Sequence, residues 1–361
     1  MDIDSLTTQD RLKLAQLPDT PQDILRLLST DEQWIMRSHV ASNENCPADV
    51  LETLALNDIN PIKRDVAVNP NCPVYVLEIL ANMPGDSDLT VRRLVAAHPC
   101  CTIELLSTLA NDSFSTVRME VAASVNTPLH VLDSLSRDQT GPVRHAVAQN
   151  PMATDSILTR LSMDIVSSVR LCVVKRSTCP AHILIALSEE DDDPHVQHQA
   201  IKHPDCPISI LERQASAGDD LLRSAIASNP ACPPALLKAL GGDAVSDVRR
   251  AVAENAGTPL RLLADMLADE DETVCAAVVS TLGKKDAESY SNAMSEGLTL
   301  STSVGPTMHQ KLFGDVLLHA GQADGYQHMQ AAEMAHKVQT HAIDLSSMRE
   351  SVSTRKAGLR L

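Results

Sequence analysis

The stretch Val143-Arg144-His145-Ala146-Val147-Ala148-Gln149-Asn150-Pro151 decides the fold of this chain, because close variants of it return at regular intervals. It returns as Val91-Arg92-Arg93-Leu94-Val95-Ala96-Ala97-His98-Pro99 and as Val248-Arg249-Arg250-Ala251-Val252-Ala253-Glu254-Asn255. We take the residue after the first valine as the anchor of each repeat. The anchors are Arg11, Arg37, Lys63, Arg92, Arg118, Arg144, Arg170, Gln197, Arg223, Arg249 and Cys275. They are 26 residues apart in most cases and 29 or 27 apart in two, and such a period predicts a repeat architecture.

The residues around each anchor predict a short helix. A valine before the anchor, a valine three after it and an alanine next to that valine recur, as in Val117, Val121 and Ala122. This spacing places the apolar side chains on one helical face. Asparagine follows, usually with proline after it, as in Asn69-Pro70, and this pair predicts the end of the helix.

A second helix is predicted after each break. Proline stands ten residues after the anchor in eight repeats, where we expect it in the first turn of the helix, and leucine stands fourteen after the anchor in ten repeats. Helices this short are marginal alone, so each repeat must cover the apolar face of its neighbour. The sequence therefore predicts an all-α solenoid of about ten to eleven two-helix repeats over residues 5–282.

Composition supports this fold and limits the partners. Of 361 residues, 43% are hydrophobic but only 2% are aromatic, which suits closely packed helices rather than a deep ligand pocket. The net charge of -17 disfavours nucleic acid. The acidic start Met1-Asp2-Ile3-Asp4 and the lack of a long apolar run predict neither a secretory signal nor a membrane span. Nine cysteines, an odd number, argue against a disulfide framework, so we expect a cytoplasmic protein.

A column of charges is locked to the repeat. Aspartate stands six residues before most anchors, and most anchors are basic. Such an aspartate can cap the first helix and pair with the arginine of its own or an adjacent repeat. We favour this structural ion-pair ladder over a groove in which the arginines recognise carboxylate or phosphate. The ladder residues are Arg37, Arg92, Arg118, Arg144, Arg170, Arg223 and Arg249, with Asp112, Asp138, Asp164 and Asp243.

Six cysteines also share one position, nine residues after the anchor. They are Cys46, Cys72, Cys101, Cys179, Cys206 and Cys232. Other repeats place threonine or alanine there, so we expect a small, buried side chain rather than a metal ligand. Cys100, beside Cys101, is the best candidate for oxidation.

Two repeats break the pattern, and local rules tend to fail at functional sites. Three residues are inserted around 82–86. In the second case, the anchor Gln197 replaces the base and follows a run of acids. Asp191, Asp193, His195 and His198 are the candidate metal ligands of this loop. We favour a solvated acidic loop without metal.

From residue 283 the repeat ends, and residues 283–361 are predicted to form a separate linker and C-terminal helical extension with a frayed tail. A Ser/Thr-rich linker is expected over 283–306, followed by helices over 307–320 and 326–344. The second helix carries His328, Glu333, His336 and His341. Glu333 and His336 have the spacing of di-iron helices, but such a site needs two of these helices, so a solvated face is favoured.

With these columns in place, the chain resembles the leucine-rich repeat variant family, best at Val66-Ala67-Val68-Asn69-Pro70-Asn71-Cys72-Pro73 and Ile226-Ala227-Ser228-Asn229-Pro230-Ala231-Cys232-Pro233. Its charge ladder is also similar to HEAT/armadillo-like repeats. The resemblance implies a right-handed superhelix of paired short helices, one α and one often 3₁₀. The period of 26 is slightly longer than usual in that family. Some members hold an iron–sulfur cluster on N-terminal cysteines, but no cysteine precedes Cys46, so no cofactor is expected.

The function follows only in outline. The sequence contains no nucleophile elbow, phosphate-binding loop, dinucleotide fingerprint or zinc-hydrolase helix. We therefore predict a non-enzymatic scaffold that binds a protein partner along an extended solenoid surface. One alternative is a HEAT-like repeat protein that binds nucleic acid through the arginine column. Another is a metal-dependent protein that uses the 189–198 loop or the C-terminal histidines and glutamate.

Overall fold

The chain folds into two compact units made of stacked helix pairs. The computed structural model describes residues 3, 6–83, 88–304 and 311–339, and its units are Met1–Ser177 and Thr178–Leu361. The division falls inside the repeat array, so both units contain repeats. The all-α solenoid predicted from the sequence is confirmed, while the boundary at residue 282 and the handedness of the superhelix stay predictions.

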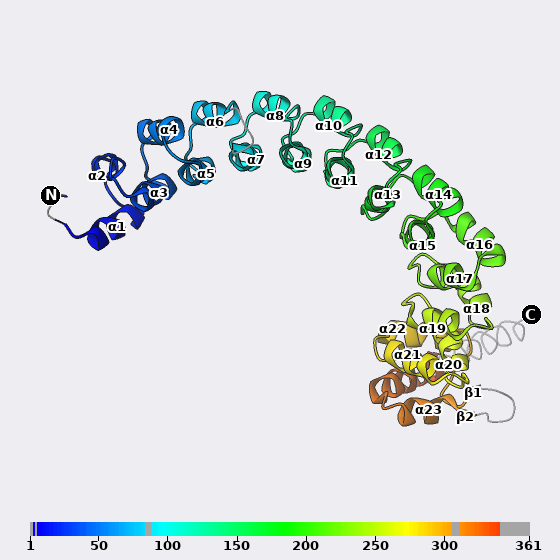
Figure 1. Ribbon diagram of the computed structural model, residues 1–361. Coiled ribbons are helices and arrows are strands. Elements are labelled where there is room, and N and C mark those ends of the chain that lie inside the picture. Colours follow the sequence, from blue (N-terminus) through cyan, green and yellow to red (C-terminus); the bar gives the residue numbers. More distant parts are fainter. Residues whose placement is uncertain (1–2, 4–5, 84–87, 305–310, 340–361) are drawn as a thin grey trace, which may run out of the picture. The chain divides into compact units, whose positions relative to one another are not determined.

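In the first unit, the first helices of the repeats form one row and the second helices form another (Figure 1). The first helices are α1 (Thr8–Gln16), α3 (Trp34–Ser42), α5 (Asn60–Val68), α7 (Leu89–Ala97), α9 (Ser115–Ala123), α11 (Gly141–Gln149) and α13 (Ser167–Val174). The second helices are α2 (Gln22–Leu28), α4 (Ala48–Asn57), α6 (Val74–Ala81), α8 (Ile103–Leu109), α10 (Leu129–Leu135) and α12 (Asp155–Leu161).

The second unit continues the same alternation. Its second helices are α14 (Ala181–Glu190), α16 (Ile208–Ala217), α18 (Pro234–Leu240) and α20 (Leu260–Met266). Its first helices are α15 (Pro194–Lys202), α17 (Asp220–Ala227), α19 (Ser246–Glu254) and α21 (Glu272–Leu282). All of these are α-helices, whereas the family resemblance implied that one helix of each pair would often be 3₁₀.

Small aliphatic side chains form the core between the two rows. On α9, Val117, Val121 and Ala122 are fully buried, and on α10 Leu132 is fully buried. Within each unit, every first helix packs on the first helices of the neighbouring repeats. Each repeat thus shields the apolar face of the next, as expected for a solenoid.

The predicted helix boundaries hold with one correction. Asn69 ends α5 as its C-cap residue in an extended conformation (φ -66°, ψ 119°), as predicted. The proline before most second helices, however, is the N-cap residue rather than part of the first turn, as Pro47 is for α4. Its ring is compatible with the extended N-cap backbone, and its carbonyl accepts the amides of Val50 and Leu51 at 3.0 and 3.1 Å.

The linker expected over 283–306 is wrong. The segment contains α22 (Ala287–Ser295), on which Tyr290 is fully buried and Ala293 nearly so. Their partners come from the last repeats and from the C-terminal segment, including Leu282 and Phe313, in one apolar cluster. The Ser/Thr-rich composition concealed this because only a few apolar side chains, spaced for one helical face, carry the burial.

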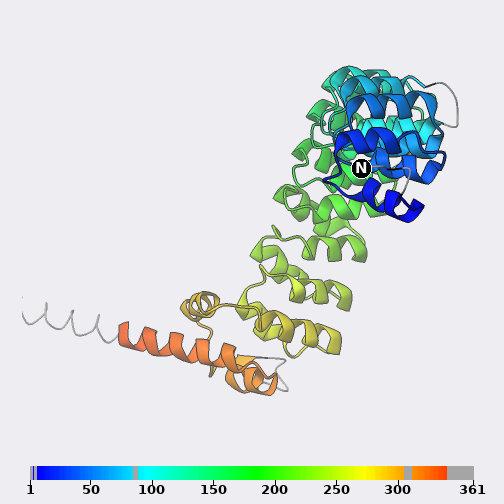
Figure 2. The same ribbon diagram turned by 90° about the vertical axis from the view of Figure 1, so that its left-hand side faces the viewer.

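The rest of the second unit packs against this cluster. β1 (Ser303–Val304) and β2 (Lys311–Leu312) form a small antiparallel pair, and α23 (Phe313–His319) follows directly. Residues 323–339 are also helical and form the long orange helix of Figure 2. Gly325 lies where a Cβ atom would collide with the Tyr290 ring, so glycine allows this helix to approach α22. Residues 307–310 and 340–344 of the expected helices lie outside the described residues.

Candidate functional site

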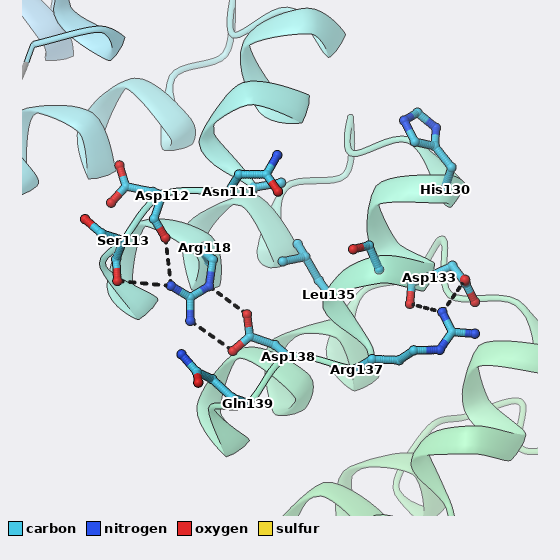
Figure 3. A pocket seen from close by; sticks show the side chains of 12 residues that line it. Asn111, Asp112, Ser113, Arg118, His130, Asp133, Leu135, Arg137, Asp138 and Gln139 are labelled. Atoms are coloured by element: carbon cyan, nitrogen blue, oxygen red, sulfur yellow. Dashed lines mark hydrogen bonds and ion pairs between the residues drawn. The ribbon is translucent and has the colours of Figure 1, made fainter.

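The arginine column joins successive repeats through bidentate ion pairs. Arg118 on α9 donates from Nε to Asp138 Oδ2 at 2.6 Å and from Nη2 to Asp138 Oδ1 at 3.0 Å. Its Nη1 donates to the backbone carbonyl of Asp112 at 2.7 Å (Figure 3). The side-chain partner therefore belongs to the next repeat, while the aspartate of its own repeat supplies a carbonyl. This geometry decides between the two pairings that the sequence allowed.

The same bidentate pair recurs along both units. The further pairs are Arg37–Asp58, Arg92–Asp112, Arg144–Asp164, Arg223–Asp243 and Arg249–Asp269. Arg170 donates to the carbonyl of Asp164 at 2.7 Å. Asp58 was missed by the sequence reasoning because it stands five rather than six residues before its anchor. The aspartate at the corresponding position of the repeat that follows Lys63 is Asp86, which lies outside the described residues.

Each aspartate also holds the turn before the next first helix. Asp138 Oδ1 accepts the backbone N–H of Thr140, the N-cap residue of α11, at 2.8 Å. Burial favours the neutral acid, but hydrogen bonds from Arg118 and the Thr140 N–H outweigh it and lower the pKa of Asp138. The hydrogen bond to Asp138 is also the main reason that the pKa of Arg118 is raised. Both partners stay ionised.

Two anchors have lost the basic side chain and keep only part of the bonding of arginine. Gln197 Nε2 donates to the carbonyl of Asp191 at 2.7 Å, and the Cys275 thiol lies 3.4 Å from the carbonyl of Asp269. The position twenty residues after Gln197 is Ala217 rather than aspartate. The anchor arginine and its aspartate partner in the next repeat are therefore lost together, as expected if this column of residues serves pairing between repeats.

A second polar ladder, made by asparagine, was missed by the sequence reasoning. Asn69 Nδ2 donates to the carbonyls of Ala41 and Asn43 in the preceding repeat at 2.7 and 2.9 Å. Its Oδ1 accepts the backbone N–H of Asn71 at 2.9 Å. Asn43, Asn150, Asn229 and Asn255 bond to the preceding repeat in the same way. Their fixed spacing was visible in the sequence but was attributed to helix termination alone.

The cysteine column is a small buried position, as predicted. All six of its cysteines are buried, and all nine cysteines of the chain are free thiols. Where threonine takes the position, its hydroxyl donates to a carbonyl six residues earlier, as Thr258 does to Val252 at 2.6 Å. Burial raises the pKa of Cys46 and Cys72 to about 12, so these thiols are unreactive. Cys100 is exposed.

The acidic loop uses its carboxylates for local structure. Asp193 caps α15 by accepting the His195 N–H at 2.9 Å, and Asp191 accepts the Asp193 N–H at 2.9 Å. In the part of the chain that the structure describes, no group of three or more His, Cys, Asp or Glu side chains is placed to hold a metal ion. Asp191, Asp193, His195 and His198 are therefore not brought together as a ligand set.

The C-terminal candidates also serve packing. Glu333 Oε1 accepts the backbone N–H of Leu300 at 2.6 Å, which ties the last helix to the segment before β1. The His328 ring lies 5.9 Å from the Tyr290 ring, centroid to centroid. His336 is exposed, and His341 lies outside the described residues.

One pocket of the ladder region is lined by arginines and aspartates that are paired with one another or with neighbouring repeats. It has a volume of about 680 Å³ and is lined by residues of the turns around α9 and α10 (Figure 3). Arg118 pairs with Asp138, and Arg137 pairs with Asp133 at 2.5 Å. The remaining acid, Asp112, binds Arg92 of the preceding repeat. The charged side chains that line this pocket are therefore paired within the chain, where they stabilise the stacked repeats rather than attract a ligand.

No helix within the described ranges has both the length and the apolar character that a membrane span requires.

No family model and no curated protein matches the sequence. Among solved structures, a leucine-rich repeat variant with a novel repetitive structural motif is similar at 22% identity and a TM-score of 0.41, over 70% of this chain and 88% of that one. A chain of a homology model of the full-length AP-3 complex, in an intermediate open conformation, is 12% identical with a TM-score of 0.35. That match covers 88% of this chain and 65% of the other.

Proposed function

We propose that this chain is a non-enzymatic scaffold that binds a protein partner along the row of first helices. The observation that carries the proposal is the contrast between two sets of positions. The phase-locked arginines, aspartates and asparagines are used between repeats. In contrast, the accessible position directly after the anchor changes from repeat to repeat. In the first unit this position is half-buried or exposed, and it holds Leu12, Ser38, Arg64, Arg93, Met119, His145 and Leu171.

A changing surface suits a protein better than a nucleic acid. A polynucleotide repeats one phosphate group, so a solenoid that reads it needs the same cation free in each repeat. The arginines that do repeat are paired with aspartates, and the side chains of Arg92, Arg118 and Arg249 are only 7, 9 and 9% exposed. The unlike side chains of the accessible position instead offer a distinct contact at each step. The free thiols buried in the core support a reducing compartment such as the cytosol.

Site-specific crosslinking tests this proposal. A photoreactive amino acid is placed at Met119 or Leu171 on the row of first helices, and at Leu129 on a second helix as the control. In the cells that naturally express the chain, we expect one protein to be crosslinked from both Met119 and Leu171 and not from Leu129. Crosslinks to nucleic acid, or no protein above the level of the Leu129 control, would contradict the proposal.

A further inference from the structure

The groove between α11 and α13 differs in charge from the rest of the chain. It has a volume of about 520 Å³ and is lined by His145, Ala148, Gln149, Ser168, Leu171, Cys172, Lys175 and Arg176. Two of these eight residues are cations and none is acidic, although the chain carries a net charge of -17. Burial raises the pKa of the Cys172 thiol, so this side chain adds no negative charge to the groove.

Arg176 occupies a position where five other repeats have asparagine. It stands six residues after the anchor Arg170, and its Nη1 donates to the carbonyls of Ala148 and Asn150 at 2.8 and 2.9 Å. These are the two bonds that asparagine Nδ2 makes elsewhere in the ladder. Asparagine makes them without a charge, so the ladder itself does not require arginine here. What arginine adds is a guanidinium group in the wall of the groove.

Lys175 adds a second positive charge beside it. Lys175 is exposed, and no residue within the described ranges forms an ion pair with it. Arg93, on the same row of helices, instead binds Glu120 at 3.1 Å. The ammonium group of Lys175 can therefore attract an anion from outside the chain.

The other lining residues suit a peptide. His145 and Gln149 are four residues apart on α11 and so lie on one face of that helix, where both can donate hydrogen bonds. Leu171 is half-buried and supplies an apolar surface for the methylene groups of a glutamate side chain. A polynucleotide needs a long series of free cations, and this groove offers only two cationic side chains.

We propose that the groove between α11 and α13 binds carboxylate side chains of an acidic segment in the partner protein. Lys175 and Arg176 supply the charge, and His145 and Gln149 supply further donors. This assignment rests on the proposed scaffold function and specifies the chemistry of the partner.

Fluorescence polarisation of the full chain with a fluorescein-labelled octaglutamate peptide tests the assignment, with octaglutamine as the uncharged probe. We expect octaglutamate to bind more tightly than octaglutamine and to be released by salt. Arg176→Asn restores the asparagine of the ladder, so it removes the charge and keeps the bonds to the carbonyls. Arg176→Asn and Lys175→Gln should each weaken octaglutamate binding about tenfold, as expected for a lost charge-assisted bond, without a change in the thermal unfolding midpoint.

Lys13→Gln is the matched control, because Lys13 is an exposed lysine of α1 and its loss changes the net charge equally. Equal affinity for octaglutamine, or equal weakening by Lys13→Gln and Arg176→Asn, would overturn the assignment. Tighter binding of a single-stranded oligonucleotide or of inorganic phosphate would also overturn it. If Arg176→Asn leaves the yield of the Met119 crosslink to the partner protein unchanged, the acidic-segment assignment fails while the scaffold function stands. If no position crosslinks a protein, the scaffold function itself fails.

Discussion

At the scale of single residues, an arginine and an aspartate with little exposure to solvent hold most pairs of neighbouring repeats together. Removing one member leaves the other charge buried without a partner, which costs far more than removing both. The asparagine ladder follows the same rule, because each amide satisfies two carbonyls of the preceding repeat. Changes at these positions should therefore affect stability more than changes at the position after the anchor, where an exposed ion pair such as Arg93–Glu120 contributes little.

The Arg118–Asp138 pair gives the first prediction. Arg118→Gln should lower the free energy of unfolding by about 3 kcal/mol, because Asp138 loses its buried partner. The double variant Arg118→Gln with Asp138→Asn should recover a large part of this loss. Urea unfolding followed by circular dichroism measures both effects. A double variant as unstable as the sum of the two single variants would show that the pair does not act as a unit.

The asparagine ladder gives the second prediction. Asn229 is fully buried and donates to the carbonyls of Ile201 and His203. Asn229→Ala should lower the free energy of unfolding by about 2 kcal/mol, because two buried carbonyls lose a donor. Asn126→Ala is the control, since Asn126 is exposed in a turn. An equal loss in the two variants would contradict the role of the ladder.

The thiols give a third prediction. At pH 8, a disulfide reagent such as Ellman's should modify Cys100 rapidly in the folded chain, because Cys100 is exposed. Burial raises the pKa of Cys101, Cys206 and Cys232 to about 11, so these thiols should react only after unfolding in urea. Three thiols lie outside the buried column: Cys100, which is exposed, and Cys172 and Cys275, which are half-buried. Rapid reaction of more than three thiols in the folded chain would contradict the burial of the cysteine column.

At the scale of elements, α22 closes the exposed end of the last repeats. Without it, Leu282 and the apolar face of α21 would face water, and terminal repeats of solenoids need such a cover. Tyr290 takes part in this contact: its ring is fully buried, and its hydroxyl donates to the carbonyl of Leu282 at 3.3 Å. Burial raises the pKa of Tyr290 to about 12, so the hydroxyl stays protonated and keeps donating.

Tyr290 variants test this cover. Tyr290→Ala should destabilise the end of the second unit by about 4 kcal/mol, as expected when a buried aromatic ring is removed. Tyr290→Phe should cost only about 1 kcal/mol, because it loses one hydrogen bond. Hydrogen exchange of residues 272–319 measures the local effect. Unchanged exchange in Tyr290→Ala would show that α22 does not protect the last repeat.

At the scale of the whole molecule, the ion-pair ladder links stability to pH. Hydrogen bonds from Arg223 and Arg249 are the main reason that the pKa values of Asp243 and Asp269 lie below the ordinary value of 3.8. A lowered folded-state pKa contributes stability that is present above the unfolded-state pKa and is lost as the pH falls through the folded-state pKa. The contribution of the ladder is therefore complete near neutral pH and disappears in acid.

This linkage gives the last prediction. The thermal unfolding midpoint should fall steeply as the pH decreases from 4 toward 2. The double variant Arg223→Gln with Asp243→Asn should show a smaller fall, because it lacks one titrating pair. Scanning calorimetry at a series of pH values measures the difference. Identical pH profiles for the two proteins would contradict the contribution of this pair.

The sequence by itself determined the repeat, its period of 26 residues, the two helices in each repeat and the small aliphatic core. Each of these features depends on neighbours in the chain or on the same position in the next repeat, so periodicity is enough to show it. The burial of Cys46 and the end of α5 at Asn69 could be predicted for the same reason.

Only the tertiary structure decided which side chains meet across repeats. The choice of Asp138 rather than Asp112 as the side-chain partner of Arg118 depends on distances between repeats, which a column of letters does not contain. The bonds of Asn69 to carbonyls of the preceding repeat were hidden for the same reason, and so was the burial of Tyr290 in a segment of linker-like composition. The groove with Lys175 and Arg176 also appears only when two helices, 26 residues apart in the chain, lie side by side.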